Sequence, residues 1–513
     1  MILLAGASGY IGSRLLRRLE HLGVPVRCLA RDPRSLRSRG FISEVFQADL
    51  LKSEGLAAAF ADIETAYYLV HSMNDGPEFE QLERKCALHF AEAARNSGVR
   101  RIIYLGGLAQ GDHLSPHMKS RIEVGEVLKA SGIPVIEIRA SVVIGSGSAS
   151  FEMIRSLVEK LPVMITPRWV RAEAQPIAIE DVTEYLLQAR EVPLSGSMIV
   201  EIGGRDVTSY LGIMQEFARQ RGLRRKFIQV PFLSLSLSSR WLTLVTPLHK
   251  QIGKHLIESV RHPSIVVRPT PAVFTVRPMG VQEAISRALR NEDTELPDSR
   301  WSDASGGHSG VAVESLTNTL RDKRTIQIPL PPELAFVPIQ RIGGTQGWYF
   351  SNSLWRIRGL IDMLMGGVGM RRGRPNPETP LVGGTLDFWR VEAYEPGHRL
   401  LLRAEMKVPG HAWLEFVASP TEGGTELQQT AHFAPVGPLG RLYWYMLWPV
   451  HVVMFTGMLR RIKEDALFRA QSTVHGLPSK IRTTASVLSP LPVPNLGEKK
   501  QGLIAETPPG TLR

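Results

Sequence analysis

Three glycines near the start of the chain have the spacing of a phosphate-binding turn. They lie in the stretch Gly6-Ala7-Ser8-Gly9-Tyr10-Ile11-Gly12, directly after the apolar run MILLA and directly before a helical pattern. This spacing gives a tight turn, a close backbone approach to phosphate and a close contact between helix and strand. Free N–H groups at the start of the helix would then face a pyrophosphate. The pattern predicts a dinucleotide site; a glycine turn without a ligand is the alternative.

A basic residue ends the second apolar run, PVRCLAR. Arg31 lies 31 − 12 = 19 residues after Gly12, where a carboxylate would bind the ribose hydroxyls of NAD. An arginine there suits the additional 2′-phosphate of NADP, and Arg34, Arg37 and Arg39 add positive charge nearby. We therefore expect NADP(H) as the cofactor, with NAD as the alternative. A solvated basic turn is the interpretation that needs no ligand.

Asp49 and Leu50 follow the third apolar run. They are placed to meet the edge of an adenine. A helix cap at Asp49 explains the same residues equally simply.

His117 and Arg121 stand four residues apart in the stretch SPHMKSRIEVGE. Residues at this spacing share one face of a helix. An imidazole can donate a proton near neutral pH, whereas a guanidinium stays charged and can hold a ribose but not release a proton. His117 is thus a candidate proton donor and Arg121 a candidate ribose contact. An exposed histidine after Pro116, at a helix start, is the alternative without function.

The elements that position these residues alternate between short apolar runs and helical patterns up to about residue 190. This alternation predicts an α/β fold, a doubly wound parallel sheet of the Rossmann type. The expected strands are MILLAG, PVRCLAR, FQADL, TAYYLV, RRIIYLGG and PVIEIRAS, and the expected helices include 11–22 and 78–97. Residues 190–290 have shorter units and predict a small substrate lobe over the carboxyl ends of the strands, where such folds bind ligands.

The first 290 residues resemble the atypical (NmrA-like, extended) short-chain dehydrogenases/reductases. The matching stretches are GASGYIG, CLARDP, ADL, YYLVHS, YLGGL and SRIEVGEVL. The resemblance implies that the dinucleotide contacts Gly6, Ser8, Gly9, Tyr10, Ile11, Gly12, Arg31, Asp49, Leu50, Leu69, Val70, His71, Leu105, Gly106 and Gly107.

The resemblance breaks down at the proton relay. Classical members use a tyrosine, a lysine four residues later, and a serine at the end of the fifth strand. This sequence has His117 and Arg121 at the places of the pair and Gly106-Gly107 at the place of the serine. Several relatives with this departure are considered sensors or structural subunits. The sequence therefore predicts a cofactor site without the usual proton donor.

The second half of the chain contains a different kind of domain. Residues 291–323 are polar and predict a linker. Residues 324–470 contain alternating strands and then a helical segment, and they resemble a domain of unassigned function that recurs behind this type of reductase. The shared stretches include GGTQGWYFSNSLWRIRGLIDMLMGGVGMRRGR, LDFWRVE, RAEMKVPGHAWLEF and LYWYMLWPVH. The resemblance implies an α+β helix-grip (START-like) fold enclosing an apolar ligand. Residues 471–513 predict a disordered tail.

The segment from Leu442 to Leu459 (LYWYMLWPVHVVMFTGML) has no formal charge and is bounded by Arg441 and Arg460. Its 18 residues are a marginal length for a membrane span. Pro449 and the lack of a second such segment favour a buried helix closing an apolar cavity. A helix lying on a membrane surface and a true span are the alternatives.

Composition limits the classes of partner and compartment. The chain has 513 residues, 43% of them hydrophobic, two cysteines and a formal net charge of +12. So few cysteines fit a reducing cytoplasm, and the start of the chain lacks the pattern of a secretion signal. No nucleic-acid motif and no metal-ligand spacing occur, so we expect neither partner. The positive charge leaves peripheral membrane contact as an alternative.

These observations together predict an NADP(H)-binding, reductase-like protein. The expected reaction is hydride transfer to the carbonyl or activated double bond of a hydrophobic small molecule. The alternatives are a non-catalytic NADP(H) sensor, a ligand carrier, and an assembly factor that uses the nucleotide for stability.

Overall fold

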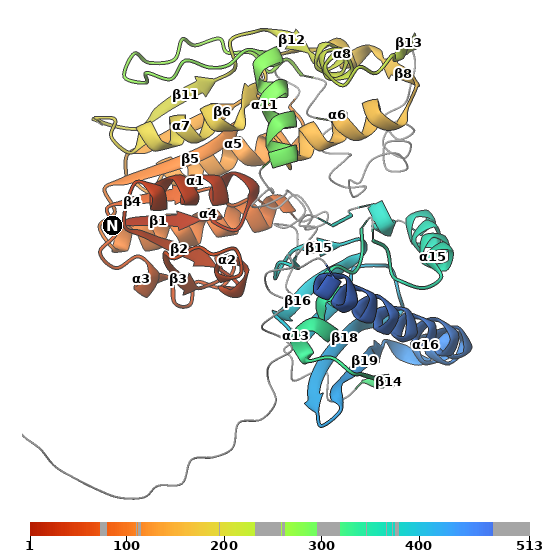
Figure 1. The fold of residues 1–513 in the computed structure, drawn as a ribbon. Helices are drawn as coiled ribbons and strands as arrows, with labels where there is room; N and C mark the ends of the chain where they lie inside the picture. Colours follow the sequence, from red (N-terminus) through yellow and green to blue (C-terminus); the bar gives the residue numbers. More distant parts are fainter. Residues whose placement is uncertain are drawn as a thin grey trace, which may run out of the picture. The chain divides into compact units, whose positions relative to one another are not determined.

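The computed structural model describes two domains, which are treated separately below (Figure 1). The described residues are 1–71, 79–108, 110, 114–193, 195–230, 258, 262–294, 319–344, 346–365, 367–371, 373–374 and 379–475. Most of the expected linker and the tail beyond His475 lie outside them.

The N-terminal domain is built on a seven-stranded parallel sheet with the order β11-β6-β5-β4-β1-β2-β3. The strands are β1 (Ile2–Ala5), β2 (Val26–Ala30), β3 (Glu44–Gln47), β4 (Thr65–Tyr68), β5 (Arg101–Gly107), β6 (Val135–Ala140) and β11 (Met198–Ile202). The predicted parallel Rossmann-like sheet is confirmed. The seventh strand, β11, extends it beyond the six expected strands.

Helices cover both faces of this sheet, which explains why its strands read as continuous apolar runs. The main covering helices are α1 (Tyr10–His21), α4 (Phe79–Asn96), α5 (Pro116–Lys129) and α7 (Ile179–Ala189). Alternate residues of β1 enter opposite cores because side chains alternate across a strand. Ile2 and Leu4 pack with α1 and α7, whereas Leu3 and Ala5 pack with α4 and α5.

A smaller lobe has its own apolar core and is built from segments that come before and after β11 in the chain. It contains α6 (Ala149–Lys160), α8 (Tyr210–Gln220), α11 (Val281–Thr294) and three two-stranded sheets. These sheets pair β7 (Val143–Ile144) with β10 (Ile177–Ala178), β8 (Val163–Pro167) with β13 (Lys226–Val230), and β9 (Glu173–Ala174) with β12 (Thr208–Ser209).

The C-terminal domain is a six-stranded antiparallel sheet followed by a long helix. Its strand order is β14-β19-β18-β17-β16-β15. The elements are β14 (Leu320–Ile328), β15 (Thr385–Leu386), β16 (Trp389–Glu395), β17 (Arg399–Ala404), β18 (Gly410–Thr421), β19 (Gly424–Pro435) and α16 (Gly437–His475). Before β15 lie the short helices α13 (Pro332–Ala335) and α14 (Val337–Gln340), and then α15 (Asn352–Leu364). The α+β arrangement of sheet and helix is confirmed; the finer START-like assignment stays a prediction.

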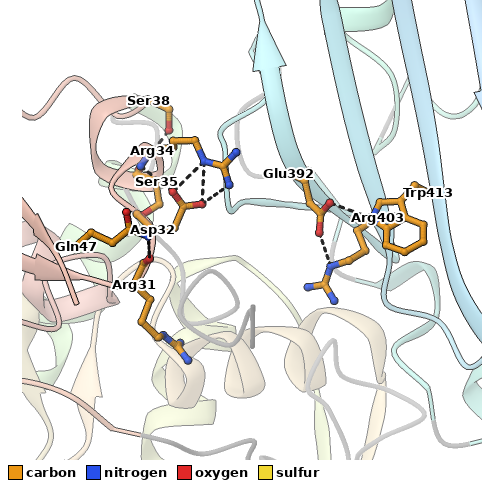
Figure 2. A network of polar contacts seen from close by, with 9 residues as sticks. All are labelled: Arg31, Asp32, Arg34, Ser35, Ser38, Gln47, Glu392, Arg403 and Trp413. Atoms are coloured by element: carbon orange, nitrogen blue, oxygen red, sulfur yellow. Dashed lines mark hydrogen bonds and ion pairs between the residues drawn. The ribbon is translucent and has the colours of Figure 1, made fainter. Parts of the chain in front are cut away.

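Aromatic side chains fill the core of the C-terminal domain. Trp348, Trp355, Phe388 and Trp389 form one buried cluster with ring centroids 5.2 to 6.2 Å apart. Charged side chains connect neighbouring strands of the sheet around this core. Glu392 forms an ion pair with Nε of Arg403 at 2.8 Å and accepts a hydrogen bond from the indole of Trp413 at 3.0 Å (Figure 2).

The long helix α16 corrects one expectation about the apolar segment between Leu442 and Leu459. Only 28% of the residues in the most apolar 18-residue window of this helix are buried. Trp444 and Phe455 pack into the domain core, whereas Tyr445 and Met446 are 62% and 66% exposed. The expectation of a buried helix is therefore wrong for the outer face. By length and composition this is the one helix, within the described ranges, that could cross a membrane, a test that core helices of soluble proteins also pass.

The expected boundaries can be placed against the elements. Strand β14 begins at Leu320, three residues before the expected end of the linker at residue 323. Helix α16 continues to His475, five residues into the expected tail.

Candidate functional site

A cleft of about 530 Å³ lies at the carboxyl ends of β1, β2, β4 and β5, the position at which parallel sheets bind their ligands. The structure brings together on its wall every residue that the sequence proposed for the site. These are Gly6, Ser8, Gly9, Tyr10, Ile11, Gly12, Arg31, Asp49, Leu50, Leu69, Val70, His71, Leu105, Gly106, Gly107, His117 and Arg121. Their contact with a nucleotide stays a prediction.

The glycine turn joins β1 to α1 and has no room for side chains within it. Gly6 has a φ of +90°, and a Cβ there would lie 2.6 Å from the carbonyl oxygen of Leu69. A Cβ on Gly12 would lie 2.1 Å from the carbonyl oxygen of Gly6. A Cβ on Gly9 meets only that same oxygen, at 3.2 Å. The turn itself therefore requires glycine at the first and third positions. At the second position, the absence of a side chain leaves space in the cleft.

The end of β2 presents a free arginine and a sequestered carboxylate. Asp32 is buried and accepts bonds from the backbone N, Nε and Nη2 of Arg34, at 2.9, 3.0 and 2.9 Å. Arg31 is exposed on the cleft wall, its side chain points away from this pair, and its carbonyl oxygen accepts from Gln47 (Figure 2). The contacts from Arg34 take up much of the acceptor capacity of this carboxylate.

The helix after β3, α3 (Leu56–Ala59), has Gly55 at its N-cap, so the interpretation of a helix cap at Asp49 is wrong. Oδ1 of Asp49 accepts from the backbone N of Leu51 at 3.1 Å, which is a local turn contact. The carbonyl oxygen of Leu50 is hydrogen-bonded to Nδ1 of His89 at 2.7 Å. Both Asp49 and Leu50 still line the cleft.

A chain of hydrogen bonds that the sequence did not reveal ends in the cleft at His71. Glu83 of α4 has a side chain only 6% exposed. One carboxylate oxygen accepts from Oγ of Ser120 on α5 at 2.5 Å, and the other accepts from Nδ1 of His71. The Nε2 atom of His71 is buried and has no hydrogen-bond partner among the described residues. The imidazole ring lies 4.7 Å from that of His117.

His117 and Arg121 both lie on α5, as their spacing predicts. Ser115 caps this helix by accepting from the backbone N of Met118 at 3.3 Å, and Pro116 occupies its first turn. Nη2 of Arg121 donates to the carbonyl oxygen of Leu105, and its guanidinium lies 5.7 Å from the ring centre of Tyr104. Arg121 is therefore already anchored to the end of β5.

Gly106 and Gly107 occupy the place of the usual serine. A Cβ on Gly107 would lie 2.8 Å from Cε of Met118. A serine there would require Met118 to move, so packing of α5 against β5 favours a glycine.

Comparison with known proteins follows the same division of the chain. Residues 6–140 match a family described as NAD(P)H-binding. The N-terminal domain is an NAD(P)H-binding domain. Residues 317–458 match a family described as a protein of unknown function (DUF2867), so the C-terminal domain is of that type.

Relatives of the NAD(P)H-binding domain include reductases. A (4-alkanoyl-5-oxo-2,5-dihydrofuran-3-yl)methyl phosphate reductase of Streptomyces griseus is 30% identical over 183 residues, which are 34% of this chain and 61% of that protein. The ceramide reductase of Caulobacter vibrioides is 25% identical over 236 residues, 45% of this chain and 74% of that protein. Cinnamoyl-CoA reductase 1 of Oryza sativa is 24% identical over 125 residues, 23% of this chain and 37% of that protein.

Solved structures also resemble the NAD(P)H-binding domain. MoeE5 in complex with UDP-glucose and NAD has a TM-score of 0.46 at 19% identity and covers 57% of this chain and 99% of its own.

Proposed function

We propose that this protein is an NADP(H)-dependent reductase of a hydrophobic small molecule, with His71 as its proton donor. The observation that carries the proposal is the arrangement of His71. One ring nitrogen is fixed by a buried carboxylate, and the other is left without a described partner beside the cleft. A sensor of nucleotide needs no such oriented proton source.

The cleft fits a dinucleotide on two structural grounds. The glycine turn leaves the backbone bare where a pyrophosphate would approach the start of α1. The exposed Arg31, beside an Asp32 already bound by Arg34, favours a 2′-phosphate over free ribose hydroxyls. Arg39 orients the turn by donating to the carbonyl oxygen of Ser8 at 3.1 Å. When bound, the reduced nicotinamide supplies the hydride.

Glu83 and Ser120 prepare His71 for proton transfer. Glu83 accepts from Nδ1, so that nitrogen carries a hydrogen and Nε2 is the atom directed elsewhere. Ser120 donates to the other oxygen and fixes the carboxylate in turn. A protonated Nε2 can then release its proton to an oxygen or carbon that receives a hydride. His117, whose ring lies 4.7 Å away, is placed to hold the same group or to return a proton to it.

The far part of the cleft wall is apolar. The apolar residues that line it are Leu108, Met118, Val142, Val143 and Tyr210, and the hydroxyls are those of Ser141, Ser148, Ser150 and Ser264. Ser141 is already engaged, because it donates to the carbonyl oxygen of Ser264 at 2.7 Å. This lining suits a hydrophobic carbonyl compound. Among the relatives, the ceramide reductase of Caulobacter vibrioides supports the same class.

The test uses the full chain, NADPH and a panel of hydrophobic aldehydes, ketones and enones. NADPH binding is followed by fluorescence, and its oxidation by absorbance. We expect turnover with at least one member of the panel. His71→Gln should lower the single-turnover rate about 10²-fold or more while NADPH affinity changes less than about threefold.

His432→Gln is the matched control, because His432 also bonds a glutamate but lies outside the cleft. Tight NADPH binding with no oxidation by the panel or by cell extract would favour the sensor. An unchanged rate in His71→Gln would show that His71 is not the proton donor. His117 would then be the remaining candidate for that role.

A further inference from the structure

The outer surface of the C-terminal domain concentrates exposed apolar side chains on two helices. Of 27 large hydrophobic side chains that are exposed among the described residues, six lie within residues 354–365 and nine within residues 436–453. We call these fifteen side chains the apolar face. They are Leu354, Ile357, Leu360, Ile361, Leu364, Met365, Val436, Leu439, Leu442, Tyr445, Met446, Trp448, Val450, Val452 and Val453. Scattered exposed apolar residues are ordinary, whereas a concentration marks an interaction site.

Neighbouring segments connect the two helices that carry the apolar face. A Cβ on Gly457 of α16 would lie 2.7 Å from the ring of Phe350, which directly precedes α15. Farther along α15, Arg358 donates to the carbonyl oxygen of Lys407 at 3.1 Å. That turn also touches the start of α16, because a Cβ on Gly440 would lie 2.4 Å from the carbonyl oxygen of Pro409. The start of α15 thus meets the middle of α16, and its later part approaches the first turn of α16. Figure 1 shows both helices on the same side of the domain.

The exposed charge beside the apolar face is positive, and the acids of α16, Glu464 and Asp465, lie beyond the apolar face. Arg356, Arg441 and Arg460 are exposed. No aspartate or glutamate occurs between residues 437 and 463, and the one acid of α15, Asp362, is fully buried. Asp362 is used internally, because it accepts from the backbone N of Gly369 and of Lys407. An apolar surface with a cationic rim complements anionic lipid headgroups above acyl chains.

The inner side of α16 determines how it can meet a bilayer. Trp444 stacks on Phe433 of β19 with ring centroids 5.6 Å apart, and Met458 and Leu459 are buried in the same core. Crossing the membrane would carry the attached sheet, with its polar edges, into hydrocarbon. The helix can therefore only lie flat. Tyr445 and Trp448 are exposed on the outer side and are of the residue types that prefer the headgroup level.

We propose that the apolar face docks the protein onto an anionic phospholipid bilayer as a peripheral membrane protein. The proposal does not depend on the reductase activity. The partner of α15 and of the outer face of α16 is then a negatively charged lipid surface.

The experiment is flotation of the full-length protein with vesicles of phosphatidylcholine alone or with phosphatidylglycerol. We expect binding to the mixed vesicles, weakened by salt. Met446→Glu combined with Leu364→Glu should reduce it at least tenfold, because two carboxylates enter the apolar contact. Leu88→Glu is the control, since Leu88 is also an exposed leucine and lies on α4 of the N-terminal domain. Arg441→Gln and Arg460→Gln should each weaken binding to anionic vesicles by about fivefold.

NADPH affinity and the circular dichroism spectrum check that each variant is folded. Wild-type protein that fails to float with anionic vesicles at low salt overturns the proposal. So does a wild-type dimer that Met446→Glu dissociates, because the apolar face would then join two copies of the chain. Equal flotation of wild type and the double glutamate variant would move the membrane contact elsewhere and also overturn it.

Discussion

Two histidine–glutamate pairs in this molecule have the same chemistry and opposite surroundings. His71 bonds Glu83 in the NAD(P)H-binding domain, and His432 bonds Glu415 in the C-terminal domain at 3.1 Å. Nδ1 of His432 also lies 3.4 Å from the hydroxyl of Thr319. Both nitrogens of His432 are thus used inside the sheet. His71 uses one nitrogen and leaves Nε2 without a described partner in a cleft.

The difference separates a structural histidine from the one that we propose as a proton donor. Glu415 has its pKa lowered, first by the hydrogen bond from His432 and further by Arg399, against the effect of burial. Its partners complete a closed network that holds strands β17, β18 and β19 together. Glu83 instead accepts hydrogen bonds from Ser120 and from Nδ1 of His71, which lie on separate elements. These bonds leave Nε2 of His71 as the ring nitrogen on the side away from Glu83. A polar network in which every group has a hydrogen-bond partner stabilises the fold. A network that leaves one titratable atom without a partner beside a cleft can take part in a reaction.

The largest expected effect comes from filling the cleft that gives His71 its role. Gly9→Val should reduce NADP(H) affinity at least 100-fold, because the new side chain occupies the space that a pyrophosphate needs. The fold should survive, since a Cβ there meets a single atom at 3.2 Å. Gly196→Ala, with nothing within 4 Å of its Cβ, is the control. Calorimetric titration measures both. Normal binding by a folded Gly9→Val variant would show that the glycine turn is not the nucleotide site.

Removing the carboxylate partner sharpens the comparison of the two pairs. Glu83→Gln should lower the chemical rate by roughly 10²-fold without weakening NADPH binding, because an amide no longer fixes the proton on Nδ1. Glu415→Gln should leave the rate unaltered. Equal effects of the two substitutions would mean that Glu83 acts only through stability.

Cofactor choice is a smaller effect at the other end of the cleft. Arg31→Ala should weaken NADP binding about tenfold to a hundredfold, or roughly 1.4–2.8 kcal/mol, and leave NAD binding unchanged. Arg34→Ala is an informative second variant, because it would release Asp32 towards the ribose and favour NAD. Titration with each nucleotide measures the preference. Tighter binding of NAD than of NADP by the wild type would contradict the assignment of Arg31.

The smallest effect concerns the closed pair and its dependence on pH. Glu415→Gln should lower the free energy of unfolding by about 1–2 kcal/mol at neutral pH, the typical loss for a charged hydrogen bond. The folded state lowers the pKa of Glu415, so its contribution is complete above the unfolded value of about 4.5. It is lost as pH falls through the lower folded value. Urea unfolding of both proteins across this range should show the two stabilities converging in acid.

The parallel sheet and the glycine turn were predictable because their causes lie within a few residues of chain. A strand, a turn of small residues and a helix succeed one another directly, and steric limits on the backbone determine the result. The same holds for Arg31, which stands at a distance from Gly12 that one helix and one strand always span. The α+β order of the C-terminal domain followed from alternation of side chains in β17, β18 and β19.

The pairing of His71 with Glu83 was not predictable in this way. Their positions carry no motif, and the residue that completes the set, Ser120, lies on another helix. A signal was nevertheless present in YYLVHS, because the end of a central strand is where a polar residue meets a ligand. The sequence assigned His71 to the cofactor only, since nothing in the chain shows which carboxylate lies beside it.

The sequence by itself determined the NAD(P)H-binding architecture, the spacing that brings Arg31 to the cleft, and the apolar character of the segment between Leu442 and Leu459. Only the tertiary structure decided which imidazole nitrogen is left open and which side of α16 is exposed. The reason is physical. Hydrogen bonds and sterics between neighbours in the chain act locally, whereas the burial of a helix face or a carboxylate depends on which distant elements pack against it.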